Sequence, residues 1–125
     1  TRDIPACWNE QYRKYLDVEV PDDREGCLQD VHWSHGSFGY FPTYSLGSFY
    51  AAQFYHKAQQ DLPGLERETG KGNTTRLLAW LRQRVHIHGR TYTSERLCEM
   101  ATGEGLNVQY FLDYLVDKYG EIYQF

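Results

Sequence analysis

Large apolar side chains recur three to four positions apart along most of the chain, which is the spacing of a helix that buries one face. In residues 5–16 they fall at Trp8, Tyr12 and Tyr15, and a proline at the start suits a first helical turn. The same spacing predicts further helices over residues 44–60, 61–69, 74–89, 93–103 and 107–120. No segment alternates apolar and polar residues as a half-buried strand does, so the pattern predicts an all-α protein.

Residues that commonly cap helices mark the ends of these segments. Asp61 is the expected N-terminal cap of the short third helix, with Pro63 in its first turn, and Asn107 is the expected cap of the last helix. The glycines that we expect to end helices are Gly89, Gly103 and Gly120. In the last helix, the residues that we expect to form a buried face are Tyr110, Phe111, Tyr114, Leu115 and Val116.

Composition narrows the class of protein. The 125 residues include 13 Lys and Arg against 17 Asp and Glu, and this net charge of -4 argues against a nucleic-acid partner. No apolar run approaches the roughly 18 residues of a membrane span, so we expect no membrane partner either. The three cysteines, at positions 7, 27 and 98, lack C-x-x-C spacing, which favours reduced thiols in a cytoplasmic protein. Without repeats or linkers, residues 1–125 are predicted to form one domain.

The segment GCLQDVHWSHGSFGYFPTY, residues 26–44, follows neither a helical nor a strand period. One interpretation is a packed connection whose rings are buried and whose polar atoms bond to the backbone. The other is a binding site on a loop held by helices, where glycines let a ligand approach the backbone. The polar residues of such a site would be Gln29, Asp30, His32, Tyr40 and Tyr44. Composition alone leaves both interpretations open.

GCLQDVHW, residues 26–33, fits the G-x-x-Q-D-x-H-W signature of the carboxypeptidase Taq family of zinc metallocarboxypeptidases. FGYFPTYSLG and the AAQ after it resemble the next block of that family. WLRQRVHIHGRTYTSERL, ATGEGLN and FLDYLVDKYGEIY then resemble its C-terminal stretch, in the same order. The whole chain therefore resembles about the last quarter of a family member, which is a single all-helical metallopeptidase with a deep groove.

This resemblance implies a zinc-dependent enzyme that hydrolyses C-terminal residues from peptides. In the family, two histidines of an H-E-x-x-H helix and a downstream glutamate bind zinc, and the glutamate of that motif acts on the metal-bound water. The sequence contains no H-E-x-x-H. We therefore expect this chain alone to bind no metal and to be inactive. Its expected partners are a peptide substrate, the remaining N-terminal part of the same enzyme and, in the full-length form, a second copy in a homodimer.

The resemblance also implies roles for single residues. His32 and one of Tyr40 or Tyr44 would donate hydrogen bonds to the oxyanion or to the substrate carboxylate. Asp30 would orient His32 or a histidine of the zinc motif, and Gln29 would help to shape the same corner. Each of these residues could instead be structural: His32 a partner of Asp30 in a packed turn, and the tyrosines core rings.

Two other functions are compatible with the residues. One is a freestanding helical module that binds peptides or proteins without catalysis; Thr1 in place of an initiator methionine argues against it and favours a start cut from a longer chain. The other is a zinc site of His86 and His88 with His32 and His35. Histidines two positions apart point to different sides of a helix, and basic residues at a helix end suit its dipole, which argues against this site. We also expect exposed apolar helix faces and self-association.

Overall fold

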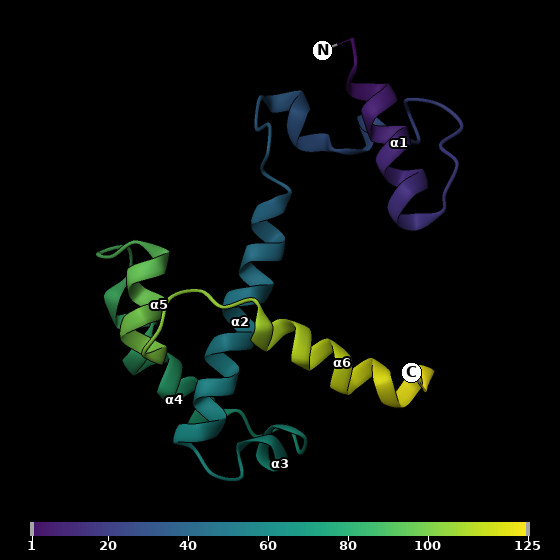
Figure 1. Cartoon of the computed structure of the whole chain (residues 1–125). Coiled ribbons are helices and arrows are strands. Elements are labelled where there is room, and N and C mark those ends of the chain that lie inside the picture. Colours follow the sequence, from purple (N-terminus) through teal and green to yellow (C-terminus); the bar gives the residue numbers. More distant parts are fainter. Residues whose placement is uncertain (1, 125) are drawn as a thin grey trace. The chain divides into compact units, whose positions relative to one another are not determined.

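The computed structural model describes residues 2–124, which form helices and loops and include no β-strand (Figure 1). The α-helices are α1 (Ile4–Leu16), α2 (Pro42–Asp61), α3 (Leu65–Thr69), α4 (Thr75–Arg84), α5 (Ser94–Thr102) and α6 (Gln109–Tyr123). The short 3-10 helices are η1 (Cys27–Gln29), η2 (Val31–His35) and η3 (His86–His88). The prediction of an all-α protein is confirmed. None of the described helices is both long and apolar enough to cross a membrane.

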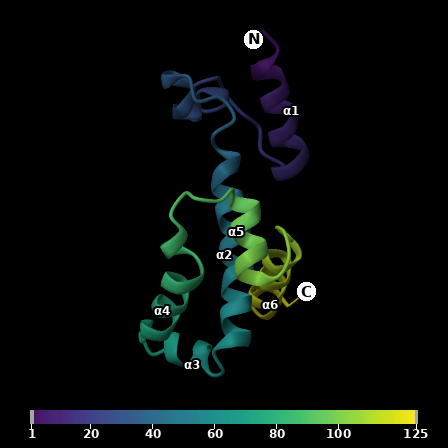
Figure 2. The same ribbon diagram turned by 90° about the vertical axis from the view of Figure 1, so that its left-hand side faces the viewer.

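The chain divides into two compact units inside α2, the first reaching to Tyr44 and the second beginning at Ser45. The first unit contains α1, η1, η2 and the first residues of α2. The second contains the rest of α2 and every later helix. In the second unit, α4 and α5 run alongside α2 (Figure 2), while α6 runs away from it (Figure 1).

Aromatic rings pack α1 against residues 33–38 in the first unit. Trp8 stacks on Tyr12, one turn later in α1, with ring centroids 4.9 Å apart. Trp8 also meets Trp33 edge to face at 6.2 Å, and Trp33 stacks on Phe38 at 5.4 Å. Because such pairs are favourable at these distances, they fix η2 beside α1.

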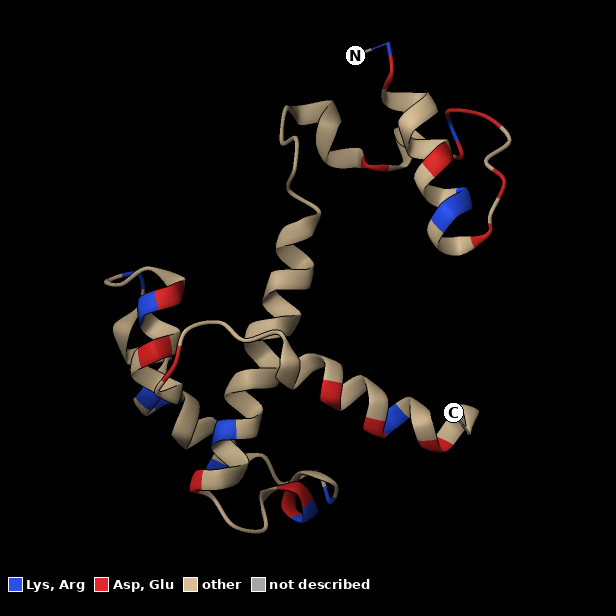
Figure 3. Ribbon diagram, in the orientation of Figure 1, with Lys and Arg blue, Asp and Glu red and all other residues tan. Residues whose placement is uncertain are grey.

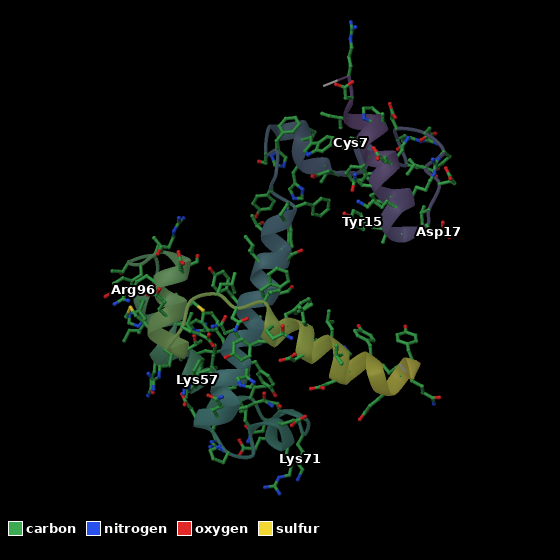
Figure 4. The ribbon with its side chains drawn as sticks, viewed as in Figure 1. Cys7, Tyr15, Asp17, Lys57, Lys71 and Arg96 are labelled. Carbon is green, nitrogen blue, oxygen red and sulfur yellow. The ribbon has the colours of Figure 1, made fainter. Side chains whose placement is uncertain are left out.

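Helix α1 ends at Leu16, where its predicted end lies. Asp17 then takes the left-handed conformation, with φ of 53°, and its N–H donates to the backbone oxygen of Arg13 at 3.1 Å. Figure 4 shows Cys7, Tyr15 and Asp17 in this region. The left-handed residue terminates the helix and lets the following loop turn back.

Gly26 lies where the loop after α1 passes close to itself. A β-carbon at this position would stand 2.6 Å from Val20 Cγ1 and 3.0 Å from the backbone oxygen of Asp22. Side chains essentially never approach their neighbours so closely, and a backbone oxygen cannot move aside alone. The loop therefore requires glycine immediately before η1.

The core of the second unit lies where α2, α3 and α4 meet, and its buried members are Ala58, Leu65 and Trp80. A pair of hydrogen bonds to Asp61 lies beside this core. The Trp80 indole N–H donates to Asp61 Oδ2 at 2.9 Å, and Lys57 Nζ, labelled on α2 in Figure 4, donates to Asp61 Oδ1 at 2.7 Å. Both donors favour the ionised carboxylate, so the hydrogen bonds of Lys57 and Trp80 lower the pKa of Asp61.

The prediction that Asp61 caps the third helix is wrong. Asp61 is the last residue of α2, and α3 begins only at Leu65, after Gly64 has reversed the chain with φ of 83°. The physical reason is that the Asp61 carboxylate is engaged by Lys57 and Trp80, so it belongs to the contact between α2 and α4.

Gln53 of α2 is fully buried and ties α5 and the loop before α6 to α2. Its Nε2 donates to Thr102 Oγ1 at 3.1 Å and to the backbone oxygen of Gly105 at 3.0 Å. Its Oε1 accepts the backbone N–H of Asn107 at 2.9 Å. The amide thus uses both donor hydrogens and its acceptor, as a buried polar group must.

Other helix ends agree in part with the predictions. Gly103 ends α5 in the left-handed conformation, with φ of 96°, as predicted. Helix α4 ends earlier than predicted, at Arg84, and Gly89 follows the separate turn η3. Helix α6 passes through Gly120 to Tyr123, because a glycine inside a helix costs only about 1 kcal/mol and does not by itself stop it.

The predicted buried face of α6 is not buried in this chain. Tyr114 is 49% exposed and Val116 is 58% exposed. The ring contacts that join α6 to α2 come from its first turn, where Phe111 meets Phe49 at 5.2 Å and Tyr110 meets His56 at 4.6 Å. The apolar spacing of α6 predicts which residues share a face, but it does not identify what covers that face.

All three cysteines are free thiols. Cys7 is exposed, whereas Cys27 and Cys98 are buried. Burial raises the pKa of the Cys98 thiol, which keeps it protonated and unreactive at neutral pH.

Candidate active site

Two 3-10 helices position the polar residues of the candidate site in the first unit. Asp30 lies between η1 and η2 and caps η2, because its Oδ1 accepts the backbone N–H of His32 at 3.0 Å. Its backbone is extended, with φ of -76° and ψ of 91°, as is usual for a helix cap. The turn forced by Gly26 and the cap provided by Asp30 therefore determine where η2 begins.

Asp30 and His32 also form a side-chain pair. His32 Nδ1 lies 2.7 Å from Asp30 Oδ1, and the two side chains are only 15% and 6% exposed. An ionised carboxylate can only accept, so Nδ1 carries the proton and donates it. His32 Nε2 receives no hydrogen bond from the described part of the chain. The pair thus orients the imidazole and leaves one ring nitrogen for another partner.

The His35 imidazole meets the His32 ring edge to face at 5.9 Å, and three aromatic rings from residues 40–44 also lie beside it. Their centroids lie 4.8 Å from the imidazole for Tyr40, 5.0 Å for Phe41 and 6.1 Å for Tyr44. Tyr40 and Tyr44 meet edge to face at 5.7 Å. All three rings are about half exposed, at 46%, 49% and 58%. The imidazole is therefore shielded from solvent on the side that faces Asp30, and partly exposed aromatic rings lie beside it.

A tight turn brings the start of α2 beside η2. Gly36 and Gly39 take positive φ values of 84° and 75°, which side chains other than glycine adopt at a cost. The N–H of Ser37 donates to the backbone oxygen of His32 at 3.0 Å. Thr43 Oγ1 donates to the backbone oxygen of Tyr40 at 2.7 Å and supports the first turn of α2. The two tyrosines are positioned by this turn.

The structure brings Asp30, His32, Tyr40 and Tyr44 together but places Gln29 differently. Gln29 is exposed, and its Nε2 donates to the backbone oxygen of Arg24 at 2.6 Å, so it supports the preceding loop. Phe41 was not predicted as a site residue, yet it contacts His32 as closely as Tyr40 does. Its place between the two tyrosine positions was the signal that could have identified it.

The residues of this chain do not fit the zinc site of the family that the signature resembles. Within residues 2–124, no three His, Cys, Asp or Glu side chains cluster as metal ligands, and the sequence lacks H-E-x-x-H. His86 and His88 lie in η3, where the His88 ring packs on Tyr92 at 5.5 Å. This chain therefore offers the site an imidazole, a carboxylate and phenolic hydroxyls.

Known proteins similar to this chain are carboxypeptidases. The family model described as carboxypeptidase Taq (M32) metallopeptidase matches residues 1–119. Carboxypeptidase 1 of Bacillus subtilis is 46% identical over 121 residues, which make up 97% of this chain and 24% of that protein. Thermostable carboxypeptidase 1 of Thermus thermophilus is 45% identical over 121 residues, again 97% of this chain and 24% of the relative.

Solved structures agree with these relatives. The crystal structure of the M32 carboxypeptidase from Deinococcus radiodurans R1 is 42% identical in sequence and matches with a TM-score of 0.92. The match covers 99% of this chain and 25% of that one. The chain thus spans about a quarter of the length of the curated relatives that it matches.

Proposed function

Since the chain belongs to the carboxypeptidase Taq (M32) family of metallopeptidases, we propose that it forms the C-terminal part of a metallocarboxypeptidase. In that enzyme it supplies side chains that bind the substrate and stabilise the oxyanion during hydrolysis of a C-terminal peptide bond. The observation that carries the proposal is the buried Asp30–His32 pair, which holds an imidazole in one orientation with Nε2 available.

His32 is suited to act where negative charge develops. Peptide hydrolysis places charge on the carbonyl oxygen, and donors fixed in advance stabilise that charge most effectively. With Nδ1–H directed to Asp30, a protonated imidazole presents Nε2–H as its second donor. Two hydrogen bonds to one Asp30 oxygen, from the ring and from the backbone of His32, keep this donor in place. Asp30 is thus proposed as a positioning residue for His32.

One of Tyr40 and Tyr44 is proposed to contact the substrate. Each ring lies beside His32, and each hydroxyl is a donor for the oxyanion or for the terminal carboxylate of the peptide. Phe41 provides an apolar surface between them. The choice between the two hydroxyls stays open.

The divalent metal expected for this family, zinc, is proposed to be bound outside these 125 residues, together with the general base that activates water. In support, the relatives are about four times as long as this chain, and no ligand cluster occurs in its described part. Assembly as a homodimer and a cytoplasmic location stay predictions.

Replacing His32 with alanine in the full-length enzyme tests the proposal. Loss of one oxyanion donor should lower kcat/KM by roughly 10²-fold or more, measured as release of a C-terminal residue from a blocked dipeptide. Zinc content, measured by elemental analysis, should stay the same because His32 is not proposed as a ligand. Full activity of the variant would exclude His32 from the mechanism.

Val31→Ala is a control in the same 3-10 helix. The aliphatic side chain of Val31 is 66% exposed. Its loss should change kcat/KM by less than about threefold, in line with a surface change. Equal losses in both variants would indicate a general disturbance of η2 and would count against a specific role for His32.

A further inference from the structure

Helices α2 and α6 diverge from the contact between Phe49 and Phe111, and residues of both line an open groove of about 930 Å³ in the second unit. Its volume is near the upper end of the roughly 300–1,000 Å³ of small-molecule sites. It is also long: the α6 residues along it extend from Tyr110 to Glu121, about 16 Å of helix. A groove of this length, with helical walls, suits an extended occupant such as another helix.

The groove has an apolar floor and aromatic walls. Ala51, Ala52 and Tyr55 line it from α2, while Phe111 and Tyr114 line it from α6. The two alanines leave room for a close approach, and Tyr114 is about half exposed. Apolar surface of this kind is stabilised when it is covered.

Charge identifies the kind of occupant. Asp113, Asp117 and Glu121 follow one another at four-residue intervals on α6. All three line the groove together with Glu66, so its lining holds four carboxylates against Lys118. Figure 3 shows acidic bands repeating along α6 with a single basic one between them. Like charges four apart repel, and carboxylates in the last turns of a helix face the negative end of its dipole.

This acidic ladder, defined as Asp113, Asp117 and Glu121, has no salt bridge within residues 2–124. Asp113 accepts a hydrogen bond from Gln109 at 2.7 Å, and Lys118 donates to the Tyr114 hydroxyl at 3.1 Å. The ladder therefore destabilises α6 in this chain unless cationic side chains from outside these 125 residues lie close to it.

We propose that the groove holds a helix that lies outside these 125 residues in the same full-length polypeptide, with an apolar stripe facing the groove and Lys or Arg along its edge. The relatives supply enough chain for such a helix, since about three quarters of their length lies beyond the matched part. The inference depends on family membership and not on the role of His32.

Neutralising the ladder tests the proposal through the sign of a stability change. In the full-length protein, Asp117→Asn/Glu121→Gln should lower Tm by several degrees, because it removes the partners of the docked cations. If the ladder has no cationic partner, the same change relieves repulsion and leaves Tm unchanged or raised, which would overturn the proposal. Glu10→Gln, at an exposed position of α1, is the control and should leave Tm unchanged.

Zero-length carbodiimide cross-linking, followed by mass spectrometry, identifies the occupant. The expected products join Asp113, Asp117 or Glu121 to lysines outside these 125 residues within one polypeptide. Cross-links between two copies would identify a second copy as the occupant. Carboxylates that label with an added amine as fast as they do in denatured protein would show an open groove. Either result would overturn the proposal, and neither depends on activity.

Discussion

At the scale of single residues, the candidate site depends on two short-range constraints. Gly26 allows a loop to pass within contact distance of Val20 and Asp22, and Asp30 both caps η2 and holds the His32 ring. A side chain at position 26 would push this loop away from η1, so the residue before the site matters as much as the residues in it.

Gly26→Ala should therefore destabilise the protein, whereas Gly47→Ala should not. An added methyl group at position 26 would stand 2.6 Å from Val20 Cγ1 and 3.0 Å from the backbone oxygen of Asp22, so both must shift, at a cost of about 1–3 kcal/mol in the free energy of unfolding. At position 47, inside α2, a β-carbon meets nothing within 4 Å, and alanine should gain about 0.5–1 kcal/mol of stability. Urea unfolding of both variants measures the difference. Equal effects would contradict the steric argument.

The sequence was informative about these residues to different degrees. Spacing of two positions is enough to suggest that Asp30 meets His32, because a capping carboxylate reaches the second residue after it. The contact of Gly26 with Val20 was not predictable, since it depends on the course of an irregular loop. The partner of Gln29, the Arg24 backbone oxygen, was not predictable for the same reason, because no sequence pattern identifies it.

At the scale of elements, apolar spacing predicted that the helices exist, but it did not predict where some of them end. Periodicity reports which residues share a face, and all six predicted segments contain helix. The position of a helix end depends on whether other side chains bind the residue that would cap it. Asp61 is taken by Trp80 and Lys57, and Gly120 lies within a helix that continues past it.

Gln53→Leu should cost roughly 3 kcal/mol in the free energy of unfolding. Leucine is similar in size but leaves the Gly105 oxygen and the Asn107 N–H without their buried partner, at about 1–3 kcal/mol for each group. Gln60→Leu, at an exposed position of the same helix, should change stability by less than about 0.5 kcal/mol. Chemical denaturation compares the two. Similar values would mean that the 103–107 loop does not depend on Gln53.

At the scale of the whole molecule, many large apolar side chains remain exposed. Within residues 2–124 twenty such side chains are exposed, among them Phe38, Leu46, Ile87 and Ile122, a high number for a chain of this length. The resemblance to one part of a larger helical protein predicted exposed helix faces, and the structure shows them. Apolar periodicity could not reveal which residues cover these faces, because it shows only that a helix face is apolar.

The 125-residue chain alone should bind less than about 0.1 equivalent of zinc and release no C-terminal residue from a blocked dipeptide, because it contains no metal-ligand cluster in its described part. The full-length protein, purified in the same way, should bind about one equivalent and be active. Elemental analysis and amino-acid release measure the two properties. Stoichiometric zinc or turnover in the short chain would contradict the division of roles proposed above.

Every contact described for the His32 cluster joins residues between positions 26 and 44. Such sequence-local contacts close short loops, and the entropy lost on closing a loop grows with its length. We therefore expect this cluster to form early in folding, without contacts to distant segments of the polypeptide. An active site shared between remote parts of one polypeptide would then form when the remaining parts dock onto the His32 cluster, which is already ordered.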